Sequence, residues 1–159
     1  APDRALAERA LELLPANEGR PDLVVLAVSL AGGDDAVLDD FGFTAAERQI
    51  VRACLRAPVL DDAPRAPSEL GRALRGLPVE AVALAGARGS QQPARRWLEE
   101  LRSVRLQITG DDLIAAGIDE GPELGRRLRA VLDQRLDGTI GPGRDAELAA
   151  ALEPAAGGS

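Results

Sequence analysis

Histidine is absent from the 159 residues of this sequence, and cysteine occurs once, as Cys54. Zinc sites are built largely from these two residue types, so their scarcity nearly excludes a zinc site. A single cysteine cannot form an internal disulfide, and its place on an apolar helical stripe predicts a buried, inert thiol. Without histidine, the usual nucleophile–base pairs cannot be assembled, which argues against an autonomous enzyme.

Aromatic side chains are also scarce. Tyrosine and methionine are absent, and the only aromatic residues are Phe41, Phe43 and Trp97. Because 45% of the residues are apolar, we expect a packed core that is mostly aliphatic. Leu101 and Val104 follow Trp97 at helical spacing, so Trp97 is expected in the core rather than as a platform for base stacking.

No apolar run approaches the roughly 20 residues that span a membrane. The apolar stretch Leu23–Ala31 is short and is better explained as a buried core helix. No signal peptide is visible, so we expect a soluble, cytoplasmic protein. The absence of an initiator methionine suggests that the chain was cut from a longer polypeptide.

Lysine is absent, so all 19 basic residues are arginine, and the formal net charge is −7. This balance argues against general, unspecific binding of nucleic acid. The charge is unevenly distributed, because residues 1–66 carry 12 acids and 7 arginines, whereas residues 91–135 carry 8 of each. Any basic surface is therefore expected in the later half of the chain.

Apolar residues recur with a helical period along most of the chain. A capping box, Thr44 with Glu47, predicts a firm helix start at Ala45. Further helices are expected over residues 3–14, 21–31, 68–76, 79–87, 93–104, 111–116, 122–137 and 144–152. Strand signals are minimal, so the sequence predicts an all-α, multi-helical array of about eight or nine short helices.

Composition also suggests a division into domains. Three prolines and the pair Asp61-Asp62 fall within residues 57–67, which is typical of a linker. We therefore predict a helical body-like segment over 1–60, a Pro/Asp-rich linker over 61–67, a helical tail-like domain over 68–153 and a disordered tail over 154–159.

The most specific pattern is a glycine-hinged helix pair near the C-terminus. Gly117 ends a short helix, Gly121-Pro122 opens a longer one and Gly138 ends it. Gly125 falls in the first turn of the longer helix, where glycine is costly relative to alanine. Either another helix packs closely against Gly125, or a phosphate approaches the backbone at the free N–H groups of this helix N-terminus.

This helix pair lies within a longer run, Leu106-Gln-Ile-Thr-Gly-Asp-Asp-Leu-Ile-Ala-Ala-Gly-Ile-Asp-Glu-Gly-Pro-Glu-Leu-Gly-Arg-Arg-Leu, which Leu136-Asp-Gly and Arg144-Asp-Ala-Glu-Leu follow. The order of these landmarks resembles the C-terminal region of bacterial tRNA nucleotidyltransferases, the CCA-adding enzymes and their poly(A) polymerase relatives. Upstream, Phe43-Thr-Ala-Ala-Glu-Arg and Ser68-Glu-Leu-Gly-Arg-Ala-Leu resemble the helical body that precedes this tail. The resemblance covers roughly residues 20–152 and is specific over 106–138.

The resemblance implies that this chain is a body-plus-tail portion that holds tRNA by its shape and backbone. In such enzymes an N-terminal head carries an Asp-x-Asp pair that binds magnesium, and a neck domain selects CTP or ATP. This chain contains no Asp-x-Asp. No catalytic residue, metal site or cofactor is therefore expected in it, whereas Mg²⁺ and CTP or ATP are expected for the parent enzyme.

Candidate contacts to RNA lie at the start of the longer helix, where backbone N–H groups and two arginines would face phosphate. These candidates are Gly121, Glu123, Leu124, Gly125, Arg126 and Arg127. The weaker candidates among the arginines are Arg95, Arg96, Arg102 and Arg129, because a mixed-charge, solvated helix face also explains them. Asp111 and Asp112 are expected to be helix N-terminal charge partners rather than catalytic acids.

Two classes of function are left open. In the first, the partner is tRNA, bound through its backbone and shape. In the second, the chain is an acidic helical module for protein interaction or self-association and binds no nucleic acid. The net charge favours the second, and the glycine pattern favours the first. A homodimer is compatible with both, and no membrane partner is expected.

Overall fold

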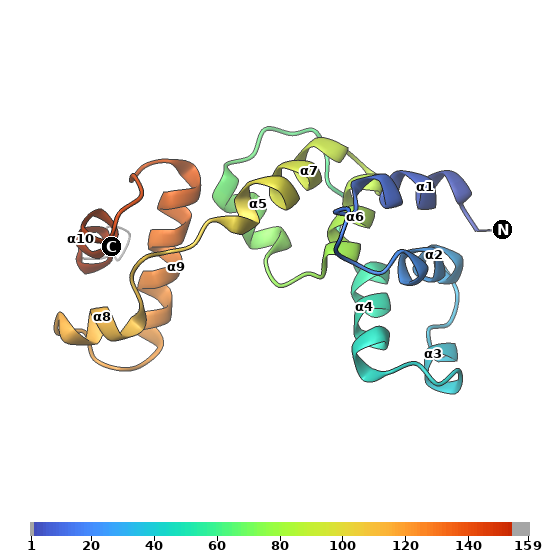
Figure 1. Cartoon of the computed structure of the whole chain (residues 1–159), viewed down its shortest axis with the longest axis horizontal. Helices are drawn as coiled ribbons and strands as arrows, with labels where there is room; N and C mark the ends of the chain where they lie inside the picture. Colours follow the sequence, from blue (N-terminus) through green and yellow to red (C-terminus); the bar gives the residue numbers. More distant parts are fainter. Residues whose placement is uncertain (1, 154–159) are drawn as a thin grey trace. The chain divides into compact units, whose positions relative to one another are not determined.

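The computed structural model describes residues 2–153, which form helices and loops with no β-strand among them (Figure 1). The predicted all-α fold is therefore confirmed. The tail predicted over residues 154–159 lies outside the described residues. The helices are α1 (Arg4–Leu13), α2 (Pro21–Leu30), α3 (Val37–Asp40), α4 (Ala45–Leu55), α5 (Pro67–Leu74), α6 (Val79–Arg88), α7 (Gln91–Glu99), the 3-10 helix η1 (Leu101–Ser103), α8 (Gly110–Ala115), α9 (Pro122–Asp137) and α10 (Arg144–Leu152).

Several helix ends form where the sequence places capping residues. In the predicted capping box, the Glu47 amide donates to Thr44 Oγ1 (3.2 Å), and the Thr44 amide donates to Glu47 Oε2 (2.9 Å). Pro122 occupies the first position of α9, and Gly138 ends this helix with a left-handed φ of +75°. These local predictions are confirmed.

The helix predicted over residues 93–104 is different, because α7 ends at Glu99 and η1 follows. Arg102 Nε donates to the Leu98 carbonyl (2.8 Å), which in a continuing α-helix would accept from the backbone amide of Arg102. The Arg102 guanidinium also binds both carboxylate oxygens of Glu18 (2.9 and 2.8 Å). A tertiary contact therefore replaces the last predicted helical turn.

The chain forms two compact units. Unit 1 comprises the described residues up to Pro64 together with Ala73–Arg102. Unit 2 comprises Arg65–Arg72 together with the described residues from Ser103 onward. The predicted division at residues 61–67 is therefore wrong: α6 and α7 belong with the N-terminal helices, and part of α5 belongs with α8, α9 and α10.

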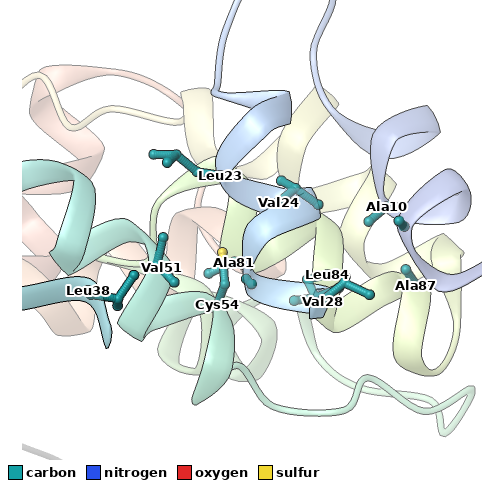
Figure 2. Packing of buried hydrophobic residues seen from close by; sticks show 12 residues of the cluster. Ala10, Leu23, Val24, Val28, Leu38, Val51, Cys54, Ala81, Leu84 and Ala87 are labelled. Carbon is teal, nitrogen blue, oxygen red and sulfur yellow. The ribbon is translucent and has the colours of Figure 1, made fainter. Parts of the chain in front are cut away.

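The reason for this correction is α6, which lies at the centre of unit 1. All of its residues from Glu80 to Ala87 are buried, and it packs against α1, α2, α4 and α7. Figure 2 shows Ala81 and Leu84 of α6 close to apolar side chains of α2 and α4. A helix that is buried on all sides needs neighbours on all sides. Proline-rich composition, by contrast, marks only an irregular loop.

The loop that was predicted as a linker begins against α6. The Leu60 amide donates to the Ala85 carbonyl (3.3 Å), and the Ser90 amide donates to the Leu60 carbonyl (2.5 Å). A Cβ on Gly89 would lie 2.0 Å from the Leu60 carbonyl oxygen, so this approach requires glycine. These bonds attach the start of the proline-rich segment to the end of α6.

The two rare side chains of unit 1 are both in its interior. Cys54 is fully buried, which confirms the predicted burial, and desolvation raises the pKa of its thiol to about 12, as is typical of an unreactive cysteine. Trp97 is 7% exposed, which confirms its predicted place in the core.

Unit 2 has a smaller apolar core. Its buried members are Ile108, Leu113, Val131 and Ala151, and α8, α9 and α10 contact one another around them. The Ser68 amide and hydroxyl both donate to the Asp137 carboxylate (2.8 and 2.6 Å), which attaches the start of α5 to the end of α9. Within residues 2–153, no helix combines the length and apolar character needed to cross a bilayer.

Candidate nucleic-acid interface

The predicted RNA-binding residues lie together at the N-terminus of α9 in unit 2. Gly121 precedes the helix with a φ of +155°, a conformation that favours glycine, and Pro122 follows it. The Leu124 amide donates to the Gly121 carbonyl (3.1 Å). Over the described part of the chain, the Glu123 amide has no hydrogen-bond acceptor. This helix start therefore offers an N–H group to an external anion.

Gly125 is exposed in the first turn of α9. A Cβ placed on it would meet no atom within 4 Å. Close packing of another helix, one of the two explanations for this glycine, is therefore not found among the described residues. Open space beside a helical backbone is what the close approach of an external group requires. The phosphate contact itself stays a prediction.

Glu123 joins the two candidate arginines. Arg126 Nη2 lies 2.7 Å from Glu123 Oε2, and Arg127 Nε lies 2.9 Å from Glu123 Oε1. The hydrogen bond from Arg126 is the main cause that holds the pKa of Glu123 below its ordinary value. The Arg126 side chain is 72% exposed, and exposed ion pairs are weak, so its guanidinium can exchange Glu123 for a phosphate.

Arg127, in contrast, has a role in the fold. Its side chain is 21% exposed, and its Nη1 donates to the carbonyls of Ala151 (2.7 Å) and Glu153 (3.1 Å) at the end of α10. These bonds satisfy carbonyl groups that a helix C-terminus leaves open. A substitution at Arg127 would therefore change the stability of unit 2 as well as any RNA contact, so Arg126 is the cleaner probe of binding.

The weaker arginine candidates also differ in their availability. Arg102 is bound to Glu18 inside unit 1. Arg95 and Arg96 are exposed on α7, and Arg129 is exposed on α9. In the part of the chain that the structure describes, none of these last three forms an ion pair. Their guanidinium groups are available to an external anion.

Asp112 joins the start of α8 to the start of α10. Its carboxylate accepts a hydrogen bond from the Thr109 amide (2.8 Å) at the start of α8 and pairs with Arg144 at the start of α10. The prediction that Asp112 is a helix N-terminal charge partner is confirmed. The hydrogen bond from Arg144, with a second from Thr109, lowers the pKa of Asp112 to about 2.

This lowered pKa predicts an acid-sensitive contribution of Asp112 to the stability of unit 2. A carboxyl group whose pKa is depressed on folding stabilises the fold above its unfolded pKa, and this contribution is lost as pH falls toward the folded pKa. The difference in unfolding free energy between the wild type and Asp112→Asn should therefore be constant above about pH 5 and shrink between about pH 4 and pH 2.

Urea titrations followed by circular dichroism at several pH values measure this difference. Asp111→Asn is the charge-matched control, because Asp111 is an exposed neighbour in the same helical turn and forms no ion pair within the described residues. A difference for Asp112→Asn that stays constant down to about pH 2 would contradict the prediction.

The comparisons with known proteins add no identification. No protein-family model, curated protein or solved structure matches the chain. Among the residues that the structure describes, no three His, Cys, Asp or Glu side chains form a group that could hold a metal ion. The relation to tRNA nucleotidyltransferases therefore stays a prediction based on the sequence pattern.

Proposed function

We propose that this chain holds and orients tRNA as the C-terminal portion of a tRNA nucleotidyltransferase-like protein. It binds the RNA through backbone phosphates and overall shape. Addition of the 3′-terminal CCA or of a poly(A) tail, together with the binding of Mg²⁺ and of CTP or ATP, belongs to the head and neck of the parent enzyme. We infer that this protein works in the cytoplasm.

The observation that carries this proposal is the open first turn of α9. Three features coincide there: a Glu123 amide without an acceptor among residues 2–153, an exposed Gly125 with free space around it, and a largely exposed Arg126. A helix N-terminus attracts anions through its N–H groups and its dipole. A glycine lets a phosphate approach the backbone, and an arginine beside it can bind two phosphate oxygens at once.

Gly125→Ala tests the phosphate contact at this glycine. Because a Cβ at this position meets nothing, alanine should raise the helix propensity of α9 and stabilise unit 2 by up to about 1 kcal/mol. The same methyl group stands where a phosphate would approach, so we expect several-fold weaker tRNA binding. A variant that is more stable yet binds RNA less well is difficult to explain by a structural role alone.

The measurement is fluorescence anisotropy with a labelled tRNA transcript, together with a urea titration for stability. Gly141→Ala is the matched control, because Gly141 is an exposed loop glycine without a positive φ, and a Cβ on it also meets no atom within 4 Å. If Gly125→Ala binds tRNA as tightly as Gly141→Ala and the wild type, the contact at α9 is excluded.

Salt dependence tests RNA binding as a whole. If a few phosphates are neutralised, the logarithm of the affinity should fall with the logarithm of salt concentration at a slope of about −0.7 to −0.9 per contact. No binding at low salt would exclude the proposal and favour the second class, an interaction module.

The second class of function, an interaction module, is favoured by the exposure of two large apolar residues, Phe41 (71%) and Val59 (60%). The molar mass from light scattering tests whether the chain self-associates.

A further inference from the structure

One face of α4 in unit 1 carries an uninterrupted row of arginines. Arg48, Arg52 and Arg56 follow one another at intervals of four residues, and together with Ala45, Gln49 and Ala53 they line an open hollow of about 460 Å³. This spacing places all six on the same side of the helix. Two alanines make the face shallow, and α4 contributes no acidic residue to it. The opposite side of α4 buries Val51 and Cys54 in the core.

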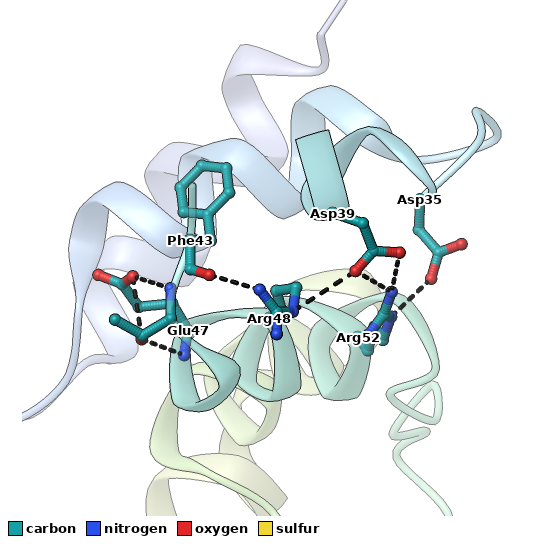
Figure 3. Close-up of polar contacts among 7 residues, drawn as sticks. Asp35, Asp39, Phe43, Glu47, Arg48 and Arg52 are labelled. Carbon is teal, nitrogen blue, oxygen red and sulfur yellow. Dashed lines mark hydrogen bonds and ion pairs between the residues drawn. The ribbon is translucent and has the colours of Figure 1, made fainter. Parts of the chain in front are cut away.

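The three guanidinium groups differ in their contacts, and Figure 3 shows those of Arg48 and Arg52. Arg52 binds Asp35 (3.1 Å) and Asp39 (3.2 Å), which reach it from the segment around α3. Arg48 lies 3.5 Å from Asp39 and donates to a backbone carbonyl. Arg56 is exposed at the end of α4 and, within the described residues, forms no ion pair.

The two aspartates show which ligand this face accepts. Their carboxylate oxygens occupy positions beside Arg52 that other anionic oxygens can take, and the hydrogen bond that Arg52 Nε donates to Asp35 Oδ2 raises the pKa of Arg52. All four side chains of these pairs are partly exposed, with exposed fractions from 30% to 57%. Ion pairs of this kind are weak and easily exchanged.

We propose that this arginine face of α4 binds the phosphate backbone of RNA, and that Asp35 and Asp39 compete with the RNA for it. This inference rests on the proposed function, because it gives unit 1 a phosphate-binding surface in addition to the α9 N-terminus of unit 2. Successive arginines lie about 6 Å apart along the helix axis, which spreads three positive charges along a strand. Guanidinium groups suit phosphate because their planar fork matches two of its oxygens.

Competition predicts opposite effects from two sets of substitutions. Arg56→Gln removes one phosphate contact, so tRNA affinity should fall about fivefold at 0.1 M salt, and the salt slope should lose about 0.7 to 0.9. Asp35→Asn with Asp39→Asn removes the carboxylate partners of Arg48 and Arg52, so affinity should rise by a similar factor. Both sets are read by anisotropy with a labelled tRNA transcript, and circular dichroism confirms that each variant is folded.

Charge-matched controls separate this contact from a general effect of net charge. Arg4→Gln removes an exposed positive charge from α1 of the same unit, and Glu99→Gln with Glu100→Gln removes two exposed negative charges near the end of α7. The controls should change affinity less than about twofold, because none of them adds or removes a phosphate contact.

The outcomes distinguish failure of this inference from failure of the proposed function. If the wild type binds tRNA and Gly125→Ala weakens it, but the Arg56 and aspartate variants behave like their controls, the arginine face is excluded and the proposed function stands. If the aspartate variant binds more weakly than the wild type while folded, competition is excluded. If the wild type binds no tRNA at low salt, both proposals fall.

Discussion

Replacing Glu147 with alanine is expected to lower the unfolding free energy of unit 2 by about 3–5 kcal/mol. Glu147 is completely buried, and its carboxylate accepts hydrogen bonds from the Gln107 amide (2.8 and 3.1 Å). It also pairs with Arg135 Nη1 at 3.2 Å, and the Arg135 side chain is only 14% exposed. Alanine would leave a nearly buried positive charge and a backbone donor without their partner, and both losses are costly.

The effect should be confined to unit 2, because Glu147 joins three parts of that unit: the segment before α8, helix α9 and helix α10. Urea titration measures the total loss, and hydrogen exchange of backbone amides shows whether α8, α9 and α10 lose protection. Glu147→Gln is the matched control, because it retains the volume and one acceptor for Gln107 while it removes the charge. A loss below about 1 kcal/mol for Glu147→Ala would show that the pair contributes little.

Replacing Trp97 with alanine is expected to cost unit 1 about 3–5 kcal/mol. The indole is 7% exposed on α7, on the same helix as the buried residues Ala94 and Leu98, and α7 packs against α6. Alanine would remove a large apolar surface from the core and leave a cavity that the surrounding helices fill only in part. Trp97→Phe keeps most of the packing, so its cost should stay below about 1.5 kcal/mol.

The same residue supplies a test of its role in binding. Trp97 is the only tryptophan of the chain, so its fluorescence reports on unit 1 alone. A buried indole should emit at short wavelength, resist quenching by iodide and remain unchanged when tRNA is added. Strong quenching of the folded protein by tRNA, with Trp97→Ala as stable as the wild type, would instead support base stacking.

Local rules accounted for most of the helices. The Thr44–Glu47 capping box, Pro122 at the start of α9 and Gly138 at its end act within one or two turns, so their residue types predicted those helix ends correctly. The fold class followed from the same periodicity. The prediction that α7 extends to residue 104 was wrong. The Arg102 side chain binds the Leu98 carbonyl and the remote Glu18, and the bond to Leu98 takes the place of a backbone hydrogen bond of the helix.

The candidate site could be predicted only in part. Glycine and proline signalled the start of α9, but sequence spacing could not show whether Gly125 meets another helix or open space. The sequence does not distinguish the adjacent arginines Arg126 and Arg127. In the structure, Arg126 is exposed, whereas Arg127 donates a hydrogen bond to the Ala151 carbonyl at the end of α10. The arginine row of α4 was not among the predicted contacts, although its spacing of four residues was a visible signal.

The sequence alone determined the helical class, most helix ends and the aliphatic, nearly aromatic-free core, because these depend on residue type and on spacing within a few turns. Tertiary structure decided the rest. It placed α6 and α7 with the N-terminal helices, joined Arg65–Arg72 to unit 2 and buried Glu147 against Arg135. These features depend on contacts between residues far apart in the chain, and local propensity contains no information about such partners.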